Sequence, residues 1–107
     1  LFTTFAIGLP EISSMLRTAT GINATDEEVL KAGERIWNLE RLFNIKAGFT
    51  AADDTLPPRL LKEPLKSGPA KGKVVELEEM LPEYYEVRGW GADGVPTAEK
   101  LKDLSIG

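Results

Sequence analysis

The sequence predicts an all-α fold, an irregular multihelical domain of about four helices with a long proline-rich connecting arm. Two observations support this. Apolar residues recur at helical spacing in separate segments, and capping residues stand at the ends of these segments. Between the second and third of them, four prolines and two glycines exclude a long helix, and the alternation of a strand is missing. We expect one helical domain over residues 1–107.

A short first helix is predicted over residues 10–20, in the segment PEISSMLRTAT. Pro10 suits a first helical turn, where the missing N–H costs no hydrogen bond. Gly21 can end the helix in the left-handed conformation.

The second helix carries the clearest signals and is predicted between Thr25 and Gly48. Thr25 and Glu28 form a capping-box pattern, and Gly48 followed by apolar Phe49 is typical of a Schellman stop. Its apolar stripe is broad enough to need several neighbours. The stripe comprises Val29, Ala32, Ile36, Leu39 and Phe43, widened by Leu30, Gly33, Trp37 and Leu42.

Residues 49–75 are predicted to form an extended arm, with about one helical turn around residues 59–61. Loops of this length are uncommon inside a compact small domain. Leucines at positions 56, 60, 61 and 65 suggest that the arm lies across a surface supplied by other parts of a chain. The apolar start, residues 1–9, has no initiator Met, no basic region and no cleavage site, so we interpret the chain as a segment of a longer parent polypeptide.

Helical spacing returns after the arm, through Leu77, Met80, Leu81, Tyr84 and Val87, and Gly89 ends this third helix. Pro82 would require the regular helix to begin near Met80 or to be split there. A final helix, over about residues 98–104, follows Thr97 as its N-cap.

Composition limits the chemistry. The net charge of −4 argues against a nucleic-acid or membrane-surface partner, and no run approaches the roughly 18 apolar residues of a spanning helix. We therefore expect a soluble protein.

The chain has no Cys and no His, which excludes the common zinc sites, a self-contained iron–sulfur cluster, a Ser-His-Asp relay and a Cys nucleophile. The lack of Cys is consistent with a reducing cytoplasm.

Other candidate sites have simpler interpretations. GPAKGK at residues 68–73 departs from a phosphate-binding loop in spacing and lacks its Ser or Thr, so a turn-rich arm is favoured. The adjacent Asp53 and Asp54 suit a turn better than acid–base catalysis. Trp37, Tyr84 and Tyr85 are aromatic residues at helical spacing, which favours a place in the core.

Four strings together resemble the C-terminal end of the tungsten-dependent aldehyde:ferredoxin oxidoreductase family. They are LFTTFAIGLPEISSMLRTATG, GERIWNLERLFNIKAGFTAADDTLPPRLL, SGPAKGKVVELEEMLPEYYEVRGW and PTAEKLKDL. The resemblance implies a parent enzyme that oxidises aldehydes to carboxylic acids. It also implies a tungsten or molybdenum ion held by two pterins, a 4Fe-4S cluster, and ferredoxin as electron acceptor.

The resemblance places Leu1 and Phe2 beside the pterin and the cluster, because a pterin-contact motif ending in a cluster cysteine precedes this stretch in the family. No catalytic residue and no metal ligand can be carried over to this chain. The implied role is support: the segment would pack on the rest of the parent and help enclose the cofactors and the substrate channel, and it would be inactive alone. Two alternatives remain open, a free-standing helical protein–protein interaction module and a small carboxylate-dependent hydrolase.

Overall fold

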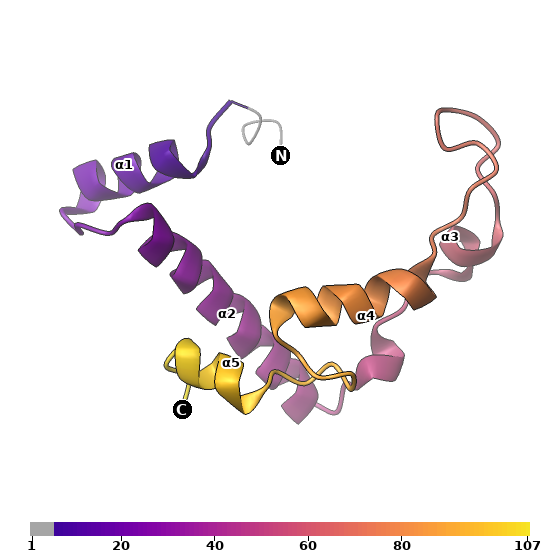
Figure 1. Cartoon of the computed structure of the whole chain (residues 1–107). Coiled ribbons are helices and arrows are strands. Elements are labelled where there is room, and N and C mark those ends of the chain that lie inside the picture. Colours follow the sequence, from indigo (N-terminus) through magenta and orange to yellow (C-terminus); the bar gives the residue numbers. More distant parts are fainter. Residues whose placement is uncertain (1–5) are drawn as a thin grey trace. The chain divides into compact units, whose positions relative to one another are not determined.

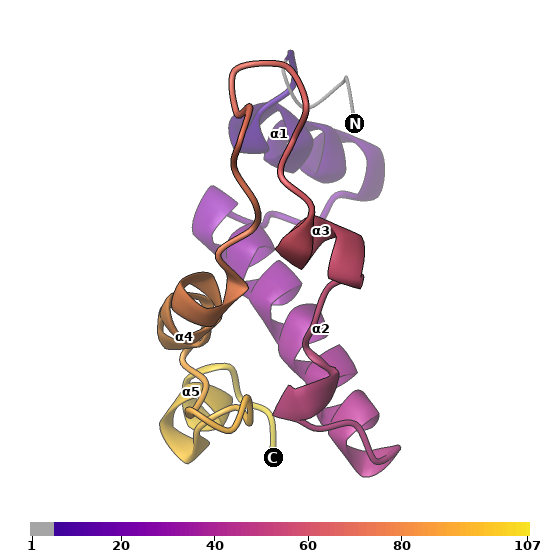
Figure 2. The same ribbon diagram turned by 90° about the vertical axis from the view of Figure 1, so that its right-hand side faces the viewer.

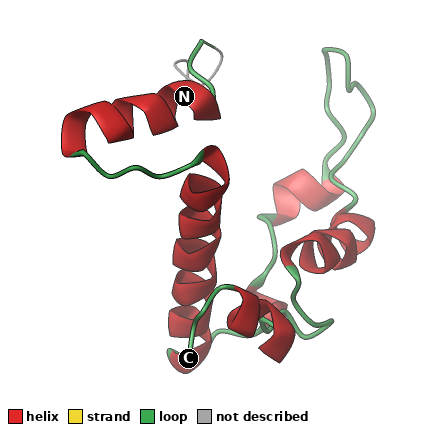
Figure 3. Ribbon diagram, turned by 60° about the vertical axis from the view of Figure 1, so that its left-hand side comes forward, coloured by secondary structure: helices red, strands yellow, loops and turns green. Residues whose placement is uncertain are grey.

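The computed structural model describes residues 6–107, which are helices joined by loops, as predicted (Figure 3). The helices are α1 (Leu9–Thr20), α2 (Asp26–Lys46), the 3-10 helix η2 (Ala51–Asp53), α3 (Pro58–Lys62), α4 (Leu77–Arg88) and α5 (Ala98–Asp103) (Figure 1). The chain forms two compact units, Leu1–Leu39 and Glu40–Gly107. None of the described helices is both long and apolar enough to cross a lipid bilayer.

The ends of α1 and α2 follow the predicted caps. At the start of α2, the Thr25 N–H donates to Glu28 Oε2 (2.8 Å) and the Glu28 N–H donates to Thr25 Oγ1 (3.2 Å). Gly21 has φ +73° and its N–H donates to the Arg17 carbonyl, which closes α1. At the end of α2, the Phe49 N–H donates to the Asn44 carbonyl (3.0 Å), the six-to-one bond of a Schellman motif.

The one buried residue of α2 is polar. Asn38 is fully buried, and its side-chain amide donates to the Glu34 carbonyl (2.8 Å). Apolar Ile36 and Phe43, in contrast, are 58% and 72% exposed. Trp37 is also 44% exposed, so its predicted place in a core is wrong for this chain. Among the apolar residues of the predicted stripe, Val29, Ala32 and Leu42 are half-buried, so the apolar face of α2 is only partly covered.

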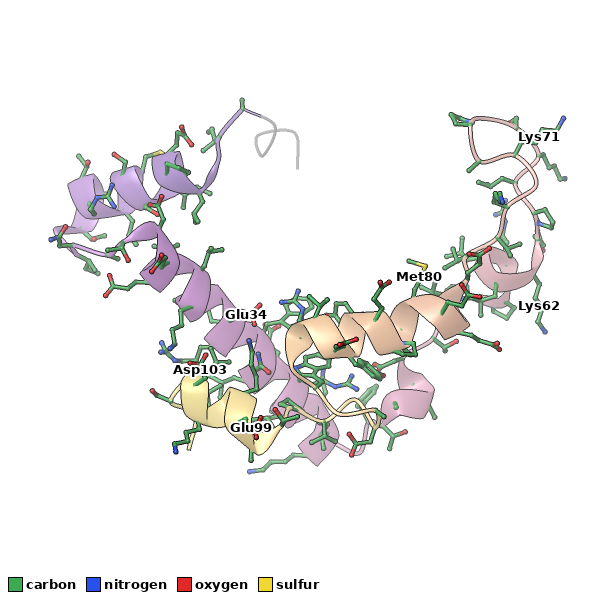
Figure 4. The ribbon with its side chains drawn as sticks, in the orientation of Figure 1. Glu34, Lys62, Lys71, Met80, Glu99 and Asp103 are labelled. Atoms are coloured by element: carbon green, nitrogen blue, oxygen red, sulfur yellow. The ribbon has the colours of Figure 1, made fainter. Side chains whose placement is uncertain are left out.

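The predicted turn-rich arm, with its short helical segment, is confirmed. After α3 the chain runs out and returns, as Figures 1 and 2 show. Backbone hydrogen bonds join the two limbs: the Leu65 N–H donates to the Lys73 carbonyl (3.1 Å), and the Val75 N–H donates to the Leu60 carbonyl (3.0 Å). Residues 68–73 form tight turns at the tip, where Lys71 lies (Figure 4).

Helix α4 begins at Leu77 and is continuous through Pro82, so both predicted alternatives, a start near Met80 and a split at Pro82, are wrong. Pro82 lies in the second turn, where its missing N–H leaves only the Glu78 carbonyl without its helical donor. Glu78 is exposed, so water can solvate that carbonyl. The helix ends at Gly89 (φ +70°), as predicted, and the Trp90 N–H donates to the Tyr85 carbonyl (2.8 Å).

The small core of the second unit lies where α4, the loop after it and α5 meet. Tyr85, Trp90 and Leu104 are its buried apolar residues. Thr97 caps α5 as predicted, because its Oγ1 accepts from the Lys100 N–H (3.2 Å). Tyr84 is 36% exposed, so only Tyr85 of the tyrosine pair lies in the core as predicted.

Candidate functional site

The second unit gathers three ionisable side chains into one cluster, Arg41, Asp54 and Tyr85. Arg41 comes from the last turns of α2, Asp54 directly follows η2, and Tyr85 lies on α4. Local capping positions the aspartates. Asp53 Oδ2 accepts from the Thr50 N–H (2.8 Å) at the start of η2, and the next residue, Asp54, bonds to Arg41.

Each of the three guanidinium nitrogens of Arg41 donates a hydrogen bond. Nη1 donates to Asp54 Oδ1 (2.7 Å) and Nη2 donates to Asp54 Oδ2 (2.5 Å), while Nε donates to the Gly94 carbonyl (2.8 Å). The guanidinium carbon also lies 4.9 Å from the centre of the Trp90 ring. The Tyr85 hydroxyl donates to Asp54 Oδ2. Both Arg41 and Asp54 therefore make contacts beyond those that join them to each other.

Gly94 allows this close approach. Its φ is +72°, in the left-handed region that favours glycine. A Cβ at this position would lie 2.4 Å from Arg41 Nη2 and 3.0 Å from the Tyr85 hydroxyl. Only a residue without a side chain lets the loop carbonyl reach Arg41 while the ring of Tyr85 stays in place.

The cluster has fixed charges at neutral pH. Hydrogen bonding to Arg41, and then to Tyr85, lowers the pKa of Asp54 below its usual value. Burial, together with the neighbouring Asp54 carboxylate, raises the pKa of Tyr85 to about 12. The hydrogen bond to Asp54 also raises the pKa of Arg41. Asp54 is therefore ionised and Tyr85 neutral at pH 7, so neither can exchange a proton readily there.

The cluster is suited to joining segments, because Arg41 and Asp54 are only 10% and 23% exposed and bond to each other. A carboxylate-dependent hydrolase would need a second acid facing Asp54. Asp54 bonds to Arg41 and Tyr85, whereas Asp53 bonds to Thr50. The geometry does not support that alternative.

The two residues that the resemblance places at the cofactors, Leu1 and Phe2, lie outside the described residues. The cluster, in turn, was not anticipated from the sequence, because its members are 13 and 31 positions apart. One signal was present: Glu34, Asn38 and Arg41 recur at helical spacing, which places three polar residues on one face of a helix.

Comparison with known proteins decides the family. Residues 1–106 match the family model described as aldehyde ferredoxin oxidoreductase, domains 2 and 3. The chain belongs to the aldehyde ferredoxin oxidoreductase family. The resemblance seen in the sequence is thereby confirmed.

Several members of this family are close in sequence. The chain is 55% identical to a tungsten-containing aldehyde ferredoxin oxidoreductase of Pyrococcus furiosus, over 99% of the chain and 18% of that protein. The corresponding protein of Thermococcus kodakarensis is 54% identical over the same shares. An aliphatic sulfonate oxidoreductase WOR-like subunit of Pyrococcus furiosus is 36% identical over 94% of the chain. The chain thus corresponds to the C-terminal part of these oxidoreductases and spans less than a fifth of their length.

A solved structure shares the fold. It is the active-site complex BamBC of benzoyl coenzyme A reductase in complex with 1,5-dienoyl-CoA, matched with a TM-score of 0.74 and 28% sequence identity. The match covers 94% of this chain and 14% of that one. In both kinds of comparison, the matching region is a small part of a much longer protein.

Proposed function

We propose that the chain is the C-terminal segment of an aldehyde:ferredoxin oxidoreductase that converts aldehydes to carboxylic acids and passes the electrons to ferredoxin. One observation supports this most strongly, the 55% identity that extends over 99% of the chain. In the parent, the segment packs on the rest of the polypeptide and helps enclose the metal centres and the substrate channel. The parent acts in the cytoplasm.

The residues of this chain do not fit a role as ligands of the implied cofactors. The sequence has no Cys and no His, and among residues 6–107 no group of three or more acidic, Cys or His residues could hold a metal. The tungsten or molybdenum bis-pterin and the 4Fe-4S cluster therefore take their ligands from the rest of the parent. Leu1 and Phe2 are proposed to lie beside them as apolar neighbours.

What the chain contributes is a preformed support. The Arg41–Asp54 pair and Tyr85 tie α2, the segment after η2 and α4 together without any group that titrates near neutral pH. Such a support can exclude water from a reactive centre without adding a competing acid or base. The isolated segment is expected to be inactive.

A chimera tests this proposal. In the Pyrococcus furiosus relative, the segment that this chain matches is replaced by residues 1–107, and the purified protein is analysed for tungsten, pterin and iron and for aldehyde oxidation with ferredoxin. We expect a metal-loaded, active enzyme, and no aldehyde oxidation by the 107-residue chain alone. A stably folded chimera without cofactors or activity would count against the proposal.

A free-standing interaction module is the second candidate, and the exposed apolar residues of the chain favour it. Phe43 and Val87, for example, are 72% and 79% exposed. This candidate predicts that the chain binds a separate partner protein and cannot replace the matching segment of the relative. The same chimera distinguishes the two.

A further inference from the structure

Helix α4 carries more apolar surface than the second unit covers. Its inner side, with Leu77 and Leu81 half-buried and Tyr85 buried, faces the core. Beside it, at spacings of four and three residues, lies a second row that is 55%, 36% and 79% exposed. We call this row the outer stripe; it consists of Met80, Tyr84 and Val87. Together the two rows extend over nearly half of the helix circumference, and such a broad arc needs neighbours on two sides.

Tyr84 gives the outer stripe a rigid centre. Its ring meets the Trp90 ring edge-on, with the centroids 5.7 Å apart, and the Arg88 guanidinium carbon lies 5.4 Å from its centre. An aromatic side chain that is already held in place loses little conformational freedom on docking. Tyrosines of this kind are common energetic centres of protein interfaces.

The outer stripe has an acidic edge. Glu79 and Glu83 are exposed and lie next to the outer stripe on the helical wheel. Figure 4 shows the Met80 sulfur projecting from the side of α4 away from α5. The matching surface should therefore be apolar at its centre, with Lys or Arg along one border.

We propose that the remainder of the parent polypeptide covers the outer stripe, an inference that rests on the proposed function. The relatives indicate what covers the outer stripe. This chain spans only 18% of the length of such a relative, so most of the parent polypeptide is available to pack on it. A second copy of the chain fits less well, since it would bring the same acidic edge to the interface twice. The outer stripe is thus a docking surface within one long chain.

The test compares the chimera with the 107-residue chain. Val87→Lys places a charge on the outer stripe, yet in the isolated chain it should not harm α4, because a lysine near a helix end, four residues after Glu83, is favourable. We expect the substitution to leave the Tm of the isolated chain within about 1 °C and to lower that of the chimera by at least about 3 °C. Ala92→Lys, which adds the same charge at an exposed position outside α4, should change neither protein.

Oxidative footprinting of Met80 gives a second readout, since methionine oxidation follows exposure. We expect Met80 to react about tenfold or more slowly in the chimera than in the isolated chain. An active, metal-loaded chimera in which Met80 reacts equally fast and Val87→Lys is harmless would overturn this inference and leave the proposed function intact. A folded chimera without cofactors would instead count against the proposed function. Self-association of the isolated chain that Val87→Lys abolishes, with no effect in the chimera, would identify a second copy as the occupant and also overturn the inference.

Discussion

Arg41 and Asp54 form a two-point ion pair, with Nη1 to Oδ1 at 2.7 Å and Nη2 to Oδ2 at 2.5 Å. The pair joins the end of α2 to the segment after η2, and Tyr85 extends it to α4. Planar two-point pairing fixes orientation as well as distance. The relative placement of these three segments therefore depends on a few hydrogen-bonding atoms. Single substitutions of the residues that carry them can test this dependence.

Asp54→Asn is expected to lower the free energy of unfolding by about 2 kcal/mol, because it leaves the mostly buried charge of Arg41 without its partner. Asp53→Asn, next to it, removes only the charge of an exposed capping side chain and should cost about 0.5 kcal/mol or less. Urea denaturation of the 107-residue chain measures both. Equal losses for the two variants would contradict the assigned role of the pair.

The Arg41–Asp54 pair also predicts that the stability of the folded chain falls in acid. Asp54 binds a proton more weakly in the folded than in the unfolded chain, because its pKa is lowered in the folded state. Its contribution is therefore fully present above the ordinary carboxyl pKa of 3.8 and is lost as the pH falls through the lower, folded value. Asp54→Asn should flatten the curve of stability against pH below about 4, relative to the unsubstituted chain. An unchanged slope would show that Asp54 is not the group responsible.

Tyr85 predicts that the stability of the folded chain falls at high pH. Its pKa of about 12 lies above the ordinary 10.0, so its stabilising contribution is complete below pH 10 and is lost as the pH rises toward 12. Absorbance of tyrosinate should show a phenol that ionises only near pH 12, and Tyr85→Phe should remove that step. The same variant should cost about 1 kcal/mol at pH 7, since one buried hydrogen bond is lost. Persistence of the late step in Tyr85→Phe would refute the assignment.

Two glycines with nearly the same backbone angle allow a matched comparison. Gly94 (φ +72°) and Gly21 (φ +73°) would both be strained by a side chain, at a cost of about 1 kcal/mol each. At Gly94 the new Cβ would also meet Arg41 Nη2, whereas at Gly21 nothing lies within 4 Å. Gly94→Ala should therefore lose about 2 kcal/mol more than Gly21→Ala in denaturant unfolding. Similar losses would mean that the cluster tolerates displacement.

Ser105 offers a stabilising substitution. It has φ +54° just after α5, and the Ile106 N–H donates to the Leu101 carbonyl (2.9 Å) in the pattern of a Schellman motif. Ser105→Gly should raise the free energy of unfolding by up to about 1 kcal/mol. Ser14→Gly, within α1, should lower it by a similar amount, because there glycine only adds freedom to the unfolded chain. A loss of stability in Ser105→Gly would contradict the role of its backbone angle.

The helices could be predicted from the sequence because their signals are local. Thr25 with Glu28, Gly48 with Phe49, and Thr97 all act within one turn, and each acts as predicted. The expectation for Pro82, a later helix start or a split, is wrong because a proline in the second turn removes only one hydrogen bond.

Burial and the site were harder to predict, because they depend on contacts between distant positions. The apolar stripe of α2 indicated a buried face, but the structure buries Asn38 and leaves Phe43 exposed. The spacing of Thr50 and Asp53 marks Asp53 as a capping residue, but no local pattern pairs Asp54 with Arg41, which lies 13 positions away. The pairing follows from the path of the chain between α2 and α4, which residue spacing alone does not give.

The two tryptophans have different surroundings, so intrinsic fluorescence can report on the folding of the chain. Trp90 is 8% exposed and lies against Arg41, whereas Trp37 is 44% exposed. In a Trp37→Phe variant, fluorescence would come from Trp90 alone, and its emission would shift to the red when water reaches the indole. Unfolding of the second unit could then be followed in real time without any added label.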